Sequence, residues 1–155
     1  MPSRSTSSSQ TQFLPTLREL VRCYQAFESY SAAHIRQLGL TPPQFDVIAT
    51  LGNTAGMSCK ELGERTLITK GTLTGVLDRL AAKGVLRRIA SETDGRSFRV
   101  ELTRQGQALF EQIFPTHLAY LRPAFDRVGS DRLGALAGVL VQLREAFEQS
   151  RSEGL

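Results

Sequence analysis

Apolar residues at helical spacing divide the chain into amphipathic helices, of which the clearest lies between Thr69 and Gly84. Its apolar residues recur at steps of three and four and form one stripe: Leu73, Val76, Leu77 and Leu80. Threonine is a favoured N-cap, and glycine is favoured just after a helix because it adopts the left-handed conformation. The pattern therefore predicts a helix of about four turns whose leucine stripe packs on a core.

The opposite face of this helix differs from an ordinary solvated face. It carries glycines and short side chains where long Glu, Lys and Gln residues would favour helix and solubility. Its residues, with those flanking it, are Lys70, Gly71, Thr72, Thr74, Gly75, Asp78, Arg79 and Ala82. Because short side chains let a helix backbone approach another surface, this face is predicted to be a contact surface.

A shorter helix and a hairpin flank the Thr69–Gly84 helix. Ser58-Cys-Lys-Glu61 matches a capping box, and only residues 66–68 separate the short helix that it opens from the next one. Two helices joined by so tight a turn form a helix-turn-helix, whose second helix enters the DNA major groove. The runs 85–90 and 97–102 then predict two strands joined through Asp94-Gly95, a strong turn signal. The fold class is therefore mainly α with a small β-hairpin wing.

Helical patterns also precede this winged helix. Residues 1–12 contain almost nothing that can be buried, so we expect a flexible tail. Residues 13–40 carry apolar side chains at helical spacing and predict a long helix that Gly39 ends. Thr41-Pro-Pro-Gln44 is another capping box, and it opens a helix that we expect to support the helix-turn-helix as scaffold.

Thr103 is predicted to cap a helix that follows the hairpin. Pro115 lies inside this helix, where proline lacks the N–H that a helix needs, so we expect a kink there or a break near Pro123. Ser130-Asp131 opens the last helix, in which apolar residues follow heptad-like steps: Leu133, Leu136, Leu140, Leu143 and Phe147.

The helices of residues 13–40 and 107–150 present more apolar surface than the winged helix of residues 41–106 can cover. An apolar patch beyond a few hundred Å² is a liability for a monomer. We therefore expect a partner to cover these seams. The alternative is that these seams pack within one chain.

The charge of the chain is concentrated on the winged helix. The whole sequence of 155 residues has a formal net charge of +4. Between Thr69 and Arg104 there are eight basic and four acidic residues, and the remainder has equal numbers of each. The entire excess therefore lies where a DNA-binding surface would need it, whereas a merely solvated surface usually spreads its charge evenly.

Ordered sequence motifs give the chain, over about residues 13–150, a resemblance to the MarR family of bacterial transcriptional regulators. The motifs are Thr72-Leu-Thr74, Leu77-Asp-Arg-Leu80, Lys83-Gly84, Arg87-Arg88, Asp94-Gly-Arg96 and Leu102-Thr-Arg-Gln-Gly106. The resemblance implies a homodimer in which both ends of the chain, residues 13–40 and 107–150, pair with those of the second copy to form a single intertwined domain. The implied dimer binds a pseudo-palindromic operator, most often as a repressor. The resemblance also implies release by a small aromatic or phenolic ligand, bound between the dimerisation helices and the winged helix.

The candidate DNA-binding residues combine the capped helix starts, the open helix face and the hairpin. They are Ser58, Lys60, Thr69, Lys70, Gly71, Thr72, Thr74, Arg79, Arg87, Arg88, Asp94 and Arg96. Lysine and arginine suit phosphates, whereas Thr72, Thr74 and Lys70 are suited to base edges. In similar proteins the arginine equivalent to Arg96 enters the minor groove, oriented by an aspartate equivalent to Asp94. Asp78 is expected either to pair with Arg79 or, by preference, to face the wing.

The family pattern is not kept at every position of the contact face. Gly75 stands where many relatives carry a basic residue, and Gly71 where many carry a small polar one. We therefore expect sparse side-chain readout, concentrated near the N-terminus of the recognition helix.

Candidates for an effector site lie in the first helix. An anion pocket would be lined by Tyr24, Tyr30, His34 and Arg36. Redox sensing through Cys23 is an alternative, although a free cysteine is usually an inert small hydrophobe, and the same applies to Cys59. His34, His117 and Cys23 lack the close ligand spacing of a metal site, so no metal or cofactor is expected.

Other function classes find little support in the sequence. An enzyme would need a glycine-rich phosphate loop, a metal-ligand cluster or a nucleophile motif, and none is recognisable. A winged helix that binds only other proteins remains an alternative. Two cysteines, no long apolar run and no signal-like N-terminus lead us to expect a cytoplasmic protein without a membrane segment.

Overall fold

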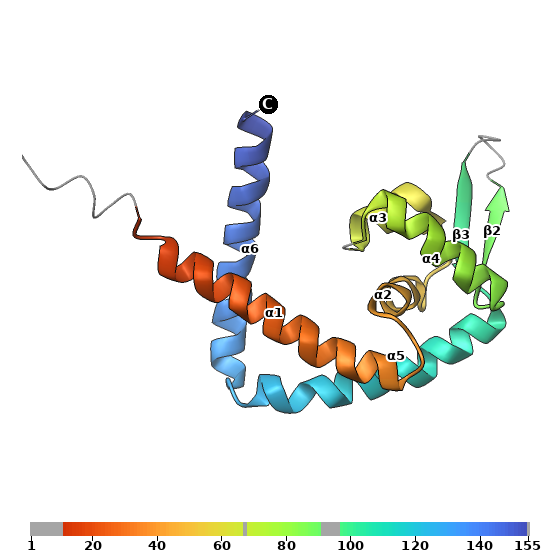
Figure 1. Cartoon of the computed structure of the whole chain (residues 1–155), viewed down its shortest axis with the longest axis horizontal. Coiled ribbons are helices and arrows are strands. Elements are labelled where there is room, and N and C mark those ends of the chain that lie inside the picture. Colours follow the sequence, from red (N-terminus) through yellow and green to blue (C-terminus); the bar gives the residue numbers. More distant parts are fainter. Residues whose placement is uncertain (1–10, 67, 91–96, 155) are drawn as a thin grey trace, which may run out of the picture. The chain divides into compact units, whose positions relative to one another are not determined.

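The computed structural model describes residues 11–66, 68–90 and 97–154 (Figure 1). Over these residues the chain forms six helices and three strands. In order they are α1 (Leu14–Gln37), α2 (Pro42–Leu51), β1 (Met57–Ser58), α3 (Cys59–Arg65), α4 (Lys70–Ala82), β2 (Leu86–Ala90), β3 (Phe98–Leu102), α5 (Arg104–Asp126) and α6 (Ser130–Glu153). The mainly α fold with a small β wing is confirmed.

The chain divides into two compact units, Met1–Phe114 and Pro115–Leu155, so that the boundary falls inside α5. The first unit contains one hydrophobic core, to which α2 to α4, the strands and the start of α5 contribute. The leucine stripe of α4 is buried as predicted, and Leu80 is fully inaccessible. Since burying one leucine contributes about 1.5–3 kcal/mol, this stripe accounts for a large part of what holds α4 in place.

The two ends of α4 differ in how well the sequence predicted them. At the C-terminal end, Gly84 has a φ of +73° and its N–H donates to the Ala81 carbonyl, while the Val85 N–H donates to Leu80. These are the two hydrogen bonds of a Schellman motif, so the predicted glycine cap is confirmed. At the N-terminal end, Thr69 occupies the N-cap position but makes no side-chain cap hydrogen bond.

Of the two predicted capping boxes, the one at α2 is complete and the one at α3 is half formed. Thr41 and Gln44 form both reciprocal hydrogen bonds at the start of α2. At α3, the Ser58 side chain accepts a hydrogen bond from the Glu61 N–H at 3.1 Å, which is one of the two hydrogen bonds of the predicted capping box. The Glu61 carboxylate instead lies 2.9 Å from Arg65, one turn further along the same helix. An exposed ion pair thus replaces the second half of the box.

The sheet is three-stranded and antiparallel, in the order β1-β3-β2. Strands β2 and β3 pair over five residues from Leu86↔Leu102 to Ala90↔Phe98, which confirms the hairpin arms. Strand β1 was not predicted, because a strand of two residues has no alternation to reveal it. It pairs with β3 through Met57↔Val100 and Ser58↔Arg99, and so fastens the start of α3 to the sheet.

Helix α5 corrects one sequence-based expectation. It runs continuously from Arg104 to Asp126 with Pro115 and Pro123 inside it, so the predicted break near Pro123 is wrong. Each proline removes a single helix donor, and a long helix can absorb such a loss when the neighbouring turns remain bonded. The start is as predicted, because the Thr103 hydroxyl accepts from the Gly106 N–H at 3.1 Å.

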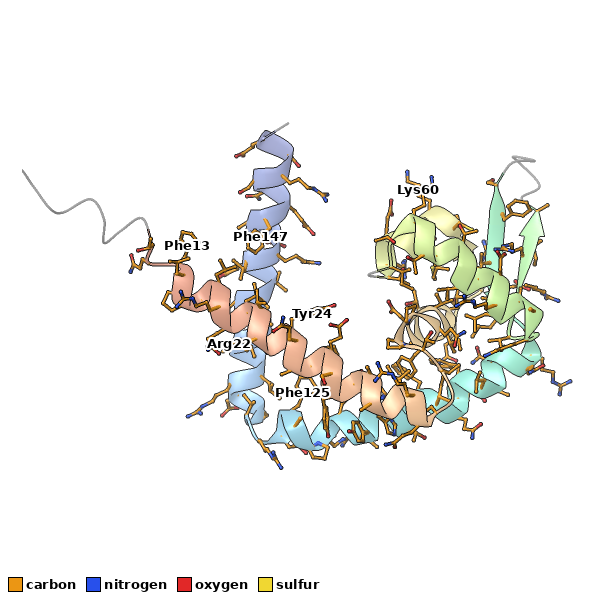
Figure 2. All side chains as sticks on the ribbon, viewed as in Figure 1. Phe13, Arg22, Tyr24, Lys60, Phe125 and Phe147 are labelled. Carbon is orange, nitrogen blue, oxygen red and sulfur yellow. The ribbon has the colours of Figure 1, made fainter. Side chains whose placement is uncertain are left out.

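The second unit exposes most of its apolar side chains. Helix α6 contains no buried residue, and Leu140 and Phe147 of its heptad-like seam are 44% and 57% exposed. Figure 2 shows the Phe147 and Phe125 side chains of this unit. No helix among the described residues combines the length and apolar character that crossing a membrane requires.

Candidate nucleic-acid interface

The outer face of α4 is open, as its composition predicted. Lys70, Gly71, Thr72 and Thr74 are all exposed at the N-terminal end of the helix. At positions 71 and 75, apart from the chain neighbours and the backbone of α4 itself, no atom lies within 4 Å of where a Cβ would be. The two glycines therefore have no packing role inside the protein, and the helix backbone is accessible along this side.

Helix α3 places a second set of polar groups beside this face. Ser58 caps the helix, and Lys60, in its first turn, is exposed and extends away from the body of the first unit (Figure 2). A groove with a volume of about 880 Å³ is lined by residues of α3, α4, β2 and β3. Leu73 and Leu77 lie among its lining residues, together with Lys60 and Phe98.

The two arginines of β2 are engaged with carboxylates. Arg88 of β2 donates to Asp78 of α4 at 2.7 Å, so Asp78 faces the wing, as preferred from the sequence. On the other face of the sheet, Arg87 donates from Nε to Glu101 at 2.6 Å. Both arginines remain candidates for phosphate contact, but a phosphate would have to share each of them with a carboxylate.

Removing the Asp78–Arg88 pair should have only a small effect on stability. The two side chains are 59% and 31% exposed, and exposed pairs contribute about 0–1 kcal/mol. In a double-mutant cycle with Asp78→Ala and Arg88→Ala, we expect a coupling free energy of about 0.5 kcal/mol from urea denaturation. A coupling several times larger would mean that the pair is a main structural link between α4 and the wing.

The remaining predicted contacts fall on both described and undescribed residues. The Thr69 hydroxyl is 3.1 Å from that of Thr72, so the two side chains form a hydroxyl pair at the entrance to α4. Arg79 is exposed and makes no ion pair with any residue in the described ranges. Asp94 and Arg96 lie outside the described residues, and their predicted roles stay predictions.

One arginine with a clear structural role was missed from the sequence. Arg99 of β3 donates to the backbone carbonyls of Ala55 and Gly56, with its shortest distance, to Ala55, at 2.7 Å. Its position in a polar-alternating strand indicates only a solvated side chain. The two carbonyls lie more than 40 residues away in sequence, so no local signal could have identified them.

The candidate effector residues are not gathered by α1 itself. Tyr30 and His34 lie one turn apart on one side of the helix, with His34 buried and Tyr30 partly exposed. Tyr24 and Arg36 are exposed and lie about 120° to either side of Tyr30. An anion pocket with all four residues would therefore need surfaces beyond this helix.

The two cysteines are free and differ in their surroundings. Cys23 is exposed on α1, whereas Cys59 is half-buried and packs against the core at the start of α3. Packing is therefore the role that the structure gives Cys59. No group of three or more potential metal ligands occurs among the residues that the structure describes.

Comparison with known proteins gives concordant matches. Residues 38–97 match a sequence model described as the MarR family. The HTH-type transcriptional regulator MhqR of Bacillus subtilis is 34% identical over 100 residues, covering 64% of this chain and 69% of MhqR.

Two solved structures show the same fold over most of their length. A mutant of MarR from E. coli, complexed with operator DNA, is 25% identical with a TM-score of 0.76, covering 86% of this chain and 96% of that one. BpsR of Bordetella bronchiseptica, whose DNA binding is regulated by 6-hydroxynicotinic acid, is 26% identical with a TM-score of 0.75, covering 84% and 98%.

Proposed function

Since the chain belongs to the MarR family of winged helix-turn-helix transcriptional regulators, we propose that it is a homodimeric repressor of a pseudo-palindromic operator. The observation that carries this proposal is the open face of α4. A Cβ at Gly71, in the first turn of α4, or at Gly75, in its interior, would meet open space, and glycine in a helix interior is about 1 kcal/mol less favourable than alanine. Close approach of the α4 backbone to a DNA groove would explain why glycines occupy these two positions.

In the proposed complex, α4 enters the major groove with its N-terminal end toward the bases. Thr72 and Thr74 suit thymine methyl groups or base edges, and Lys70 suits a guanine. The candidates for phosphate contact are Lys60, Arg79, Arg87 and Arg88. Arg96 is proposed to enter the minor groove, a position at which narrow A·T-rich stretches attract arginine.

The proposed dimer uses the two ends of the chain. Along α1 and its N-cap runs a line of exposed apolar side chains, which are those of Phe13, Val21 and Tyr24. Helix α6 exposes Leu140 and Phe147. A second copy could cover both surfaces and place the two α4 helices about 34 Å apart, one turn of DNA. Figure 2 labels Phe13, at the start of α1, and Tyr24, further along the same helix.

Leu140→Asp should convert the dimer into monomers. It places a charge in the centre of an apolar seam, where burial of an unpaired carboxylate is strongly unfavourable. Size-exclusion chromatography with light scattering should show a mass near 17.1 kDa, the mass of one chain. Gln142→Asp adds the same single charge to an exposed position on the opposite face of the same helix, so it is the charge control and should leave the dimer mass unchanged.

A small aromatic anion is proposed as the effector, since BpsR responds to 6-hydroxynicotinic acid. Tyr24, Tyr30, His34 and Arg36 are the residues proposed to line its site. Thermal denaturation with and without millimolar 6-hydroxynicotinate and benzoate tests the ligand class. Stabilisation that disappears in Arg36→Met would support this site.

Binding to the DNA upstream of its own gene tests the proposed function. A mobility-shift titration at moderate salt should show affinity about 10³-fold higher than for random DNA of the same length. Equal affinity for the two fragments would contradict sequence-specific recognition of that site. Charge reversal at Arg88 that left regulation intact in cells would instead favour a winged helix that binds only proteins.

A further inference from the structure

The guanidinium of Arg99 binds backbone carbonyls where a neighbouring arginine binds a carboxylate. Its Nε and Nη2 donate to the Ala55 carbonyl at 3.1 and 2.7 Å, and Nη2 also donates to the Gly56 carbonyl at 3.0 Å. Arg87, on the paired strand, lies against Glu101 instead. Because a guanidinium carries five donors in a rigid plane, one Arg99 side chain can hold two successive carbonyls.

These carbonyls lie immediately before the start of α3. The chain passes from Gly56 through β1 to Ser58, which is both the last residue of β1 and the N-cap of α3. Strand β1 pairs with β3 at two positions only. The three hydrogen bonds of Arg99 therefore add substantially to a short backbone ladder, and they act on the segment that leads directly into the helix.

The backbone of the loop lies directly on β3. Gly56 has a φ of +88°, and a Cβ at this position would lie 2.5 Å from the Val100 carbonyl oxygen. Only glycine satisfies both the positive φ and the close approach. This contact brings the Ala55 and Gly56 carbonyls within reach of Arg99.

The far end of the same loop is held separately. The Asn53 N–H donates to the Gln107 side chain at 3.2 Å, and Gln107 Nε2 donates to the Asn53 side chain at 2.7 Å. Asn53 has a φ of 58°, a left-handed conformation that asparagine tolerates well. The loop is thus fixed to α5 at its beginning and to β3 at its end. Within the loop the Thr54 hydroxyl accepts from the Gly56 N–H at 3.2 Å, and Arg99 is the side chain that joins the end of the loop to β3.

We propose that Arg99 is a positioning residue for DNA binding: it fixes the N-terminus of α3, and with it Lys60, relative to the sheet. This inference rests on the proposed function, because it assumes that Lys60 meets a phosphate. Arg99 acts through the Ala55 and Gly56 carbonyls and makes no DNA contact of its own. Without it, the start of α3 has more positions available, and the Lys60 contact is weakened.

Arg99→Met should weaken binding to the upstream DNA fragment about tenfold, the effect of losing one well-formed charged contact. Arg99→Lys keeps the charge but cannot hold both carbonyls as a planar fork, so it should fall between Arg99→Met and the unaltered protein. Arg22→Met removes the same charge from α1, where Arg22 pairs with the exposed Glu19, and should leave affinity within about twofold.

A double variant separates positioning from direct contact. Lys60→Ala alone should lower the slope of log affinity against log salt by about 0.9, the value for one phosphate contact. Adding Arg99→Met to Lys60→Ala should then leave the slope unchanged and lower the affinity by no more than about twofold. The reason is that the effects of two residues that act through one contact are not additive. A further fall of about 0.9 in the slope, with multiplied losses, would identify Arg99 as a DNA contact and overturn the proposal.

Amide hydrogen exchange tests the link without DNA. In the free, folded protein, Arg99→Met should speed exchange at Glu61 and Leu62, whose N–H groups lie in the first turn of α3, and thermal denaturation should confirm that the variant is folded. If the unaltered protein does not prefer its upstream DNA, the proposed function fails, whereas the exchange result still stands. Unchanged exchange in Arg99→Met would overturn the positioning role whatever the DNA result.

Discussion

Gly75→Glu should abolish specific DNA binding and lower affinity for the upstream fragment by at least about a hundredfold. The added carboxylate would face the phosphates of the proposed DNA partner, and like charges repel. The variant should still fold. Position 75 is exposed on α4, and no atom lies within 4 Å of where its Cβ would be. A mobility-shift titration measures the loss, and circular dichroism checks that the helices are retained.

Gly75→Ala is the matched control for this loss. It adds a side chain at the same open position without a charge, and it should stabilise the protein by about 0.5–1 kcal/mol because alanine favours helix. Its DNA affinity should fall much less than that of the glutamate variant. Unimpaired DNA binding by Gly75→Glu would show that this face of α4 does not meet DNA.

Gly106→Ala should destabilise the folded protein by about 2–4 kcal/mol, which is a large share of the total stability of a typical domain. Gly106 is in the first turn of α5, and a Cβ there would lie 1.9 Å from the Val85 carbonyl oxygen. That oxygen already accepts from the Thr103 N–H at 3.0 Å, so it cannot move without loosening the junction between α5 and the strands.

Urea denaturation at a fixed protein concentration measures this effect, since the stability of the proposed dimer would depend on concentration. Gly71→Ala is the control, because its added methyl group meets open space and should raise the midpoint slightly. If Gly106→Ala unfolded at the same urea concentration as the unaltered protein, the tight approach of α5 to Val85 would be contradicted.

The parts of the fold that the sequence predicted are those with strong periodic or conformational signals. The stripe of α4 could be predicted because burial selects an apolar side chain at every third or fourth residue. Gly84 could be predicted because its φ of +73° strongly favours glycine. Hydrogen-bond partners were less predictable. Thr69 stands at the predicted N-cap, yet its hydroxyl pairs with that of Thr72, another acceptor within its reach.

The candidate site shows the same limit. The open face of α4 was predicted because it follows from the small size of its side chains. The orientation of Asp78 toward the wing was predicted as well. The roles of Arg99 and β1 depend on chain segments that only the completed fold brings together. Helix α5 continued through Pro123 because a proline lowers helix stability locally without deciding where a long helix ends.

The carboxylates beside the hairpin arginines affect how binding should depend on ions. Asp78 and Glu101 act as internal counterions for Arg88 and Arg87. If a duplex takes over either arginine, the carboxylate left behind attracts a dissolved cation, which offsets part of the cation release that accompanies DNA binding. The protein should therefore be less sensitive to ionic strength than the number of cations proposed to face DNA suggests, and it should retain more of its DNA affinity when cellular potassium rises.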